Sequence, residues 1–190
     1  MKFFRLIFAF NEADDANYVS CNAGQIHGLS EYSAMEGKSL QTKWPLVTLP
    51  YNTKEGSVFS DYLHNVYGWL LVSDRFIHCV KPFAEEAVEY LDITILNSST
   101  GQERTDYKVA NVIDVVDALD LDNSVYDTYV AAGKEFKVIR KFSLKFPAVQ
   151  NHHIFKLPCE PASVFVSEEI KNIIEKHSMT GFDFIPVQLS

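Results

Sequence analysis

Two adjacent histidines, His152 and His153, followed by Cys159, form the cluster in this chain that most resembles a metal-ligand set. In a strand, neighbouring side chains point to opposite faces, so adjacent histidines do not readily share one metal ion. This stretch also lacks a second cysteine or a carboxylate at ligand spacing. The pattern therefore predicts no metal site, with one histidine in the core and the other exposed.

An acidic segment contains a second candidate cation site. Residues 120–124 resemble the beginning of a calcium-binding loop, but Val125 stands where glycine is needed and Ala131 where a bidentate glutamate is needed. We therefore expect no calcium there. The surrounding residues 106–130 hold six aspartates against one lysine. Two interpretations remain open, namely a solvated acidic face and a patch that contacts a partner protein.

Two serines next to acidic residues, Ser73 and Ser167, are candidate nucleophiles by type. Neither lies in the Gly-x-Ser-x-Gly turn that exposes a catalytic serine. Each is followed by an acidic residue and then by apolar residues at helical spacing, which is typical of a helix N-cap. Glycine-rich phosphate loops are also missing. We therefore predict no catalytic residues, no cofactor and no enzymatic activity.

The composition is that of a globular protein that does not bind nucleic acid. Of 190 residues, 47% are hydrophobic and 22% are charged, and the net charge is −8, whereas nucleic-acid binders usually carry a basic surplus. The three cysteines are scattered, which favours a reducing compartment. Arg5 interrupts the apolar N-terminal run, which is too short for a signal peptide, and no stretch is long enough to span a membrane. We expect a cytoplasmic protein.

The pattern of elements predicts an α+β fold with a mixed, largely antiparallel sheet and two short helices following Ser73 and Ser167. The two strand–cap–helix units align at an offset of 94 residues, which leaves an internal repeat and a recurring local pattern both open. Pro82 is expected to end or kink the first helix, or to open a second one. Residues 136–146 alternate apolar and basic side chains, which predicts a half-buried strand with a basic outer face.

We expect one domain over residues 1–190, with an irregular N-terminal part (1–57) and a more regular part (58–190). Trp69 lies within an apolar run and is expected in the core, whereas Trp44 lies in the irregular part and is a candidate for binding.

Several strings in residues 58–190 resemble immunity protein family eleven, a bacterial family associated with polymorphic toxin systems. The strings that carry the resemblance are Gly68-Trp69-Leu70-Leu71-Val72-Ser73-Asp74-Arg75-Phe76, Glu89-Tyr90-Leu91, residues 107–120, His153-Ile154-Phe155-Lys156-Leu157, Val166-Ser167-Glu168-Glu169-Ile170-Lys171, Thr180-Gly181-Phe182 and Phe184-Ile185-Pro186-Val187. The resemblance implies a protein that binds and neutralises a cognate toxin encoded nearby. It carries over no catalytic residues.

Two other functions remain open. The chain could reverse a toxin's product as an enzyme, for which His78, His152 and His153 are the candidate groups, or it could act as an effector adaptor or chaperone. For a toxin-binding protein, we expect the interface to include Asp114, Asp117, Asp120 and Asp122, which would complement a basic toxin site, and Trp44 as an aromatic anchor.

Overall fold

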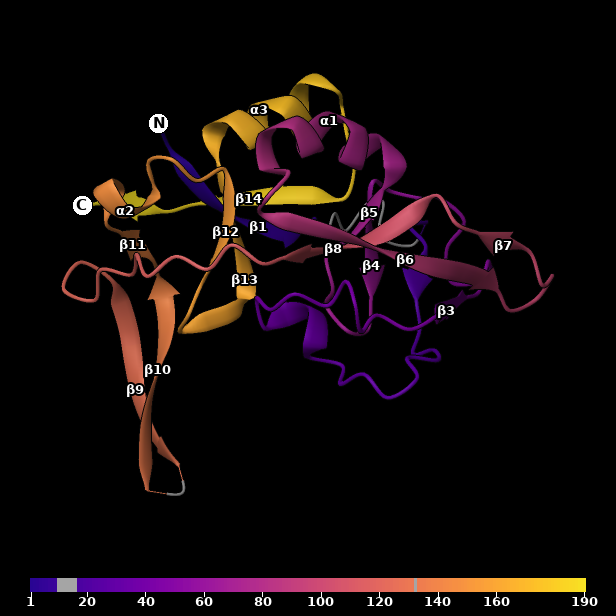
Figure 1. Ribbon diagram of the computed structural model, residues 1–190, viewed down its shortest axis with the longest axis horizontal. Coiled ribbons are helices and arrows are strands. Elements are labelled where there is room, and N and C mark those ends of the chain that lie inside the picture. Colours follow the sequence, from indigo (N-terminus) through magenta and orange to yellow (C-terminus); the bar gives the residue numbers. More distant parts are fainter. Residues whose placement is uncertain (10–16, 132) are drawn as a thin grey trace.

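The computed structural model describes residues 1–9, 17–131 and 133–190 (Figure 1). It has an α+β fold dominated by strands, with mixed but largely antiparallel sheets, which confirms the predicted fold class. The described strands form a larger and a smaller sheet, a separate pair of short strands and a separate hairpin.

The larger sheet has the strand order β2-β4-β5-β8-β6-β3, with β7 paired to β6. The β2–β4 and β3–β6 pairs are parallel, and the others are antiparallel. Through β2 and β3, the largely irregular N-terminal part contributes strands to the sheet built by later residues. The bounds are β2 Ser20–Cys21, β3 Val47–Tyr51, β4 Tyr62–Asn65, β5 Leu71–Ser73, β6 Val88–Asn97, β7 Glu103–Arg104 and β8 Tyr107–Val112.

The smaller sheet has the order β12-β13-β1-β14 and is antiparallel throughout. It joins the beginning of the chain to its end, because β1 lies between β13 and β14, two strands from the C-terminal part of the chain. Beside it, β11 pairs in parallel with β15. The bounds are β1 Phe3–Phe8, β11 Ser143–Leu144, β12 Ile154–Leu157, β13 Glu160–Ser167, β14 Phe182–Pro186 and β15 Gln188–Leu189.

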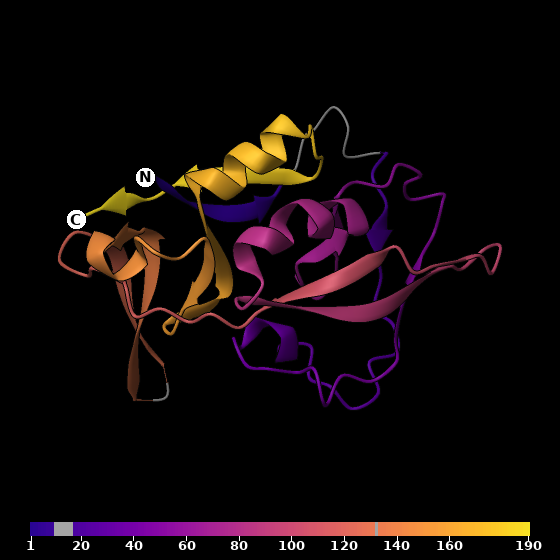
Figure 2. The ribbon, with the colours of Figure 1, turned by 45° about the horizontal axis from the view of Figure 1, so that its top comes forward.

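The two longer helices, α1 (Asp74–Ala84) and α3 (Glu168–Lys176), lie side by side over the sheets (Figures 1 and 2). Both begin as predicted: Ser73 Oγ accepts a hydrogen bond from the Phe76 N–H, and Ser167 Oγ accepts one from the Ile170 N–H. These hydrogen bonds satisfy first-turn N–H groups that have no partner within the helix. Phe76 and Ile170, on the apolar faces of the two helices, are fully buried in one core cluster with strands of both sheets.

Two predictions about local structure need correction or completion. Helix α1 runs through Pro82 and ends at Ala84. The single predicted strand over 136–146 is wrong, because β10 (Lys134–Lys141) ends early and is followed by β11 and the short helix α2 (Phe146–Val149). Phe142 and Leu144 are buried as expected, but Phe136 and Val138 are exposed because β10 lies outside both sheets.

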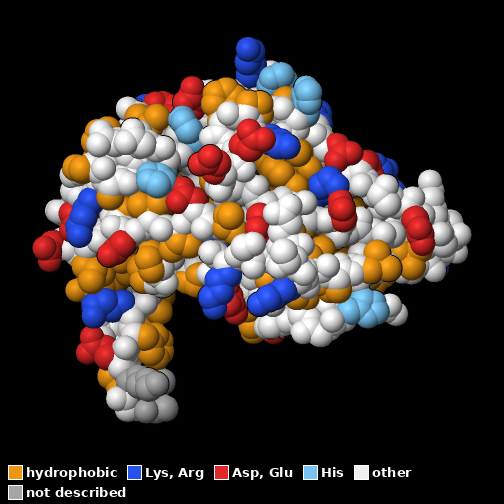
Figure 3. Space-filling model, viewed as in Figure 1, with side chains coloured by type: hydrophobic (Ala, Val, Ile, Leu, Met, Phe, Trp, Pro, Cys, Tyr) orange, Lys and Arg blue, Asp and Glu red, His pale blue; other side chains and the backbone are white. Residues whose placement is uncertain are grey.

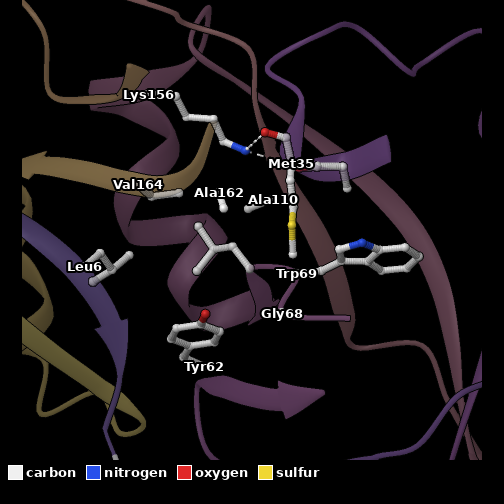
Figure 4. Close-up of a pocket in the computed structure, with 11 residues that line it drawn as sticks. Leu6, Met35, Tyr62, Gly68, Trp69, Ala110, Lys156, Ala162 and Val164 are labelled. Carbon is white, nitrogen blue, oxygen red and sulfur yellow. Dashed lines mark hydrogen bonds between the residues drawn. The ribbon is translucent and has the colours of Figure 1, made fainter. Parts of the chain in front are cut away.

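A buried lysine connects the smaller sheet to the N-terminal part. Lys156 on β12 is 3% exposed, and its ammonium donates hydrogen bonds to the carbonyl oxygens of Ala34 (3.3 Å) and Met35 (2.8 Å) in the 3₁₀ helix η1, Ser33–Met35. Figure 4 shows the side chain reaching toward Met35. Lys156 and Met35 both line a cavity of about 40 Å³. Burial lowers the pKa of Lys156 from 10.5 to about 8, because desolvation disfavours the charged ammonium.

Candidate protein interface

A two-stranded hairpin extends away from the rest of the protein. Its strands, β9 (Val125–Ala131) and β10, pair antiparallel with each other and with no other described strand. Figure 1 shows the hairpin at the lower left, with only its base against the rest of the chain. An isolated two-stranded hairpin is at best marginally stable in water, so an extended one needs strong pairing or a partner surface.

Apolar side chains lie on both faces of the hairpin. Tyr129 and Phe136 are cross-strand partners, and each is 47% exposed, whereas Val130 on the opposite face is 73% exposed. Figure 3 shows hydrophobic side chains along the hairpin and at its base. Because neither face packs on a sheet, this apolar area stays in contact with water. Contiguous exposed apolar surface of this kind usually marks an interaction site.

An ion pair between Arg140 of β10 and Asp127 of β9 joins the two strands of the hairpin. A second ion pair, between Lys137 and Glu135 at 3.0 Å, lies within β10. The Lys137 ammonium also lies 5.5 Å from the Tyr126 ring centroid. Residues 125–141 contain four cations and two carboxylates, a net charge of +2 in a chain of −8. The hairpin therefore differs in charge from the rest of the protein.

The base of the hairpin is firmly attached. Ser124 Oγ donates to the carbonyl oxygen of Asp120 and accepts a 3.0 Å hydrogen bond from the Ser143 N–H. Beyond it, Phe142 and Leu144 are buried in a core cluster with α2 and the smaller sheet. The apolar side chains are thus presented on a projection from a fixed base.

The four predicted interface aspartates have different environments. Asp114 binds His152, with 2.6 Å between Oδ2 and Nδ1. Asp120 accepts hydrogen bonds from the Asn123 side chain and from two backbone N–H groups of its own turn, and these hydrogen bonds lower its pKa. Asp117 and Asp122 are exposed. All four lie on the segment that leads into the hairpin.

The Trp44 side chain is half-buried and is held by contacts with other parts of the chain. Its Nε1–H donates to the carbonyl oxygen of Asp92 at 2.7 Å, and its ring centroid lies 5.5 Å from that of the buried Trp69. It lines a hollow of about 520 Å³ that includes the exposed Leu46 and none of the four aspartates. The structure therefore does not place Trp44 and the aspartates in one pocket.

The histidine pair lies at another hollow, of about 640 Å³, beside the exposed Phe83. Both histidines are partly exposed, so the expectation of one in the core is wrong. His153 Nδ1 contacts Ser167 Oγ at 3.0 Å and Glu169 Oε2 at 3.4 Å. Because both partners share one ring nitrogen and Ser167 is fully buried, this arrangement is not a nucleophile–base relay.

Among the described residues, no group of three or more histidine, cysteine or acidic side chains could hold a metal ion. His78 lies on α1 and lines a separate hollow. The thiols of Cys21, Cys79 and Cys159 are all free. In the part of the chain that the structure describes, no helix is long and apolar enough to cross a membrane.

The sequence reasoning missed the apolar residues of the hairpin. A signal was available, because residues 125–130 and 136–141 are both rich in β-branched and aromatic residues and flank a short segment with Gly133. That pattern predicts a hairpin. The alternation within β10 instead suggested a buried face, because it cannot indicate whether another layer covers the strand.

The chain is thus an α+β protein, mostly strand, that presents an apolar, charged hairpin next to an acidic segment. It belongs to the Immunity protein family (Imm11), whose family model matches residues 13–189. The match extends the resemblance seen over residues 58–190 to most of the N-terminal part. The comparison with curated proteins finds no match.

Proposed function

We propose that this protein neutralises a cognate bacterial toxin by binding it stoichiometrically, with the β9–β10 hairpin as the main contact surface. The observation that carries the proposal is the exposure of Tyr129, Val130 and Phe136 on a projecting hairpin. Membership of an immunity family supports a toxin as the partner in general.

The chemistry of the hairpin suits a protein partner. Interface cores are enriched in aromatic residues and arginine, and a few buried aromatic anchors carry most of the binding energy. The hairpin offers two stacked rings beside the Arg140–Asp127 pair, and the free apolar area would be removed from water on binding. The exposed Asp117 and Asp122 precede this surface and would add acidic contacts at its rim.

We further propose that the protein acts in the cytoplasm, without enzymatic activity, on a toxin encoded beside its own gene. The test is a dose series in bacteria that express the neighbouring toxin and this protein from separately inducible promoters. A binding protein protects only when its amount reaches that of the toxin, and the two should elute as one complex of defined stoichiometry. Loss of protection together with failure to co-purify would refute the proposal, and co-purification with persisting toxicity would instead indicate an adaptor.

A second candidate function is enzymatic reversal of the toxin's product. The His152–Asp114 pair favours it, because a carboxylate that orients one ring nitrogen can leave the other to move a proton. The pair also opens on the 640 Å³ hollow. The same dose series decides, because an enzyme protects at a small fraction of the toxin's amount and His152→Ala would abolish that protection. A binder retains protection in the His152→Ala variant.

A further inference from the structure

A cationic cavity of about 330 Å³ lies at the base of the hairpin, between β10 and the β14–β15 region. Three of its lining side chains, Arg5, Arg140 and Lys141, carry positive charge. None of the described residues that line it is acidic, and the remaining wall residues are Phe142, Ile185, Pro186, Val187 and Gln188. The cavity thus combines positive charge with largely apolar walls in a chain whose net charge is −8.

Arg5 is the central group of this cavity. It lies in the middle of β1, opposite Phe165 of β13 and Ile185 of β14, and its guanidinium lies 5.6 Å from the Phe142 ring centroid. Its Nε atom is buried and has no hydrogen-bond partner among the described residues. Within the described chain, no carboxylate lies in ion-pair range of Arg5. A buried donor without a partner costs free energy, which an acceptor from outside would recover once the Arg5 side chain turns its Nε–H toward the cavity.

The other two cations flank Arg5 differently. Arg140 is exposed and is already paired with Asp127, so its charge is partly compensated. Lys141 is exposed and forms no ion pair with any described residue. Arg5 and Lys141 therefore leave two cations in one cavity without a carboxylate of their own.

We propose that this cavity receives the carboxylate of an aspartate or glutamate in an acidic, apolar-flanked segment of the toxin. This proposal rests on the proposed function and identifies the chemistry of one contact within it. A guanidinium binds a planar carboxylate through two parallel hydrogen bonds. The apolar walls suit the flanking side chains of a peptide segment, and an overall charge of −8 opposes the approach of a nucleic acid.

The first test needs no toxin. In ¹⁵N-labelled protein, the Arg5 Nε–H resonance, identified by its loss in Arg5→Lys, is followed during titration with acetyl-Leu-Glu-Leu-amide, the matched Gln peptide and inorganic phosphate. The Glu peptide should shift this resonance downfield, with an affinity roughly fivefold higher than that of the Gln peptide. Equal shifts with the Gln peptide, no shift at all, or tighter binding of phosphate would each overturn the proposal.

The second test uses the toxin. Arg5→Gln and Lys141→Gln should each weaken toxin binding by roughly tenfold, whereas Lys43→Gln, at an exposed lysine outside the cavity, should not. Lys141 is exposed, so its variant remains informative if Arg5→Gln fails to fold. The cavity would lie outside the interface if the Lys141→Gln variant bound the toxin with wild-type affinity and the peptide did not shift the Arg5 resonance. The proposed function, toxin binding by the hairpin, would still stand. A wild-type protein that does not bind the toxin would instead refute the proposed function, and the peptide titration would still report on the cavity.

Discussion

Tyr129 and Phe136 stack across the β9–β10 hairpin with ring centroids 5.8 Å apart, although nothing in the described structure covers the pair. Stacked rings that remain half exposed stabilise the hairpin by roughly 0.5–1.5 kcal/mol and are available to a partner. Replacing the two rings should therefore affect toxin binding more than the stability of the protein.

Replacing both rings with alanine should weaken toxin binding strongly. We expect a loss of about 2 kcal/mol per ring, or roughly 30-fold each, because buried aromatic anchors dominate binding energy. The free energy of unfolding should change less, by roughly 0.5–1.5 kcal/mol for the pair. Calorimetric titration and urea unfolding measure the two quantities. Tyr32→Ala, at an exposed ring outside the hairpin, is the matched control and should retain full affinity.

The acidic segment is tested by reversing the charge of its two exposed members. Asp117→Lys with Asp122→Lys should slow association with the toxin by roughly tenfold at low salt, and should weaken the salt dependence. Asp114 and Asp120 are left in place because their carboxylates hold local structure. Stopped-flow association rates at two salt concentrations provide the measurement. An unchanged rate at low salt would exclude these aspartates from the interface.

The Lys156→Met variant tests the burial of the Lys156 ammonium through the pH dependence of the free energy of unfolding. The pKa of Lys156 is about 8 in the folded protein against 10.5 in the unfolded chain. Between these values the unfolded chain binds a proton that the folded one does not, so the wild type gains stability as the pH rises through this window. The variant lacks that gain. The wild-type minus variant difference in unfolding free energy should therefore rise by roughly 2–3 kcal/mol between pH 7 and 10.5.

Urea unfolding at several pH values measures this difference, in which the other titrating groups cancel. Lys43→Met, at an exposed lysine, provides the control and should give a flat difference. A flat difference for Lys156→Met as well would mean that the ammonium is solvated in the folded protein.

Gly181 lies between α3 and β14, and replacing it tests how closely this turn approaches Tyr62. Its φ is +85°, and a Cβ there would lie 2.3 Å from the carbonyl oxygen of Tyr62. Gly181→Ala should therefore destabilise the protein by more than the 1–3 kcal/mol of backbone strain alone. Gly28 has nearly the same φ, +87°, with open space around it. Gly28→Ala separates strain from collision, and equal losses in thermal unfolding of the two variants would contradict the close contact.

The sequence by itself determined where both longer helices begin and where several strands lie. Ser73 and Ser167 carry the signature of helix caps, and the apolar runs around β1, β6 and β12 indicate strands, because these signals depend on neighbouring residues. The family resemblance likewise rests on short strings and holds over nearly the whole chain.

Only the tertiary structure decided which strand faces are covered. The alternation of β10 shows that the strand has two faces, but whether a sheet packs on one of them depends on where the chain places its other layers. The cavity around Arg5 was equally inaccessible to sequence reasoning, since its cations come from β1 and β10, more than a hundred residues apart. Packing between distant segments therefore determines the surface that a partner would meet.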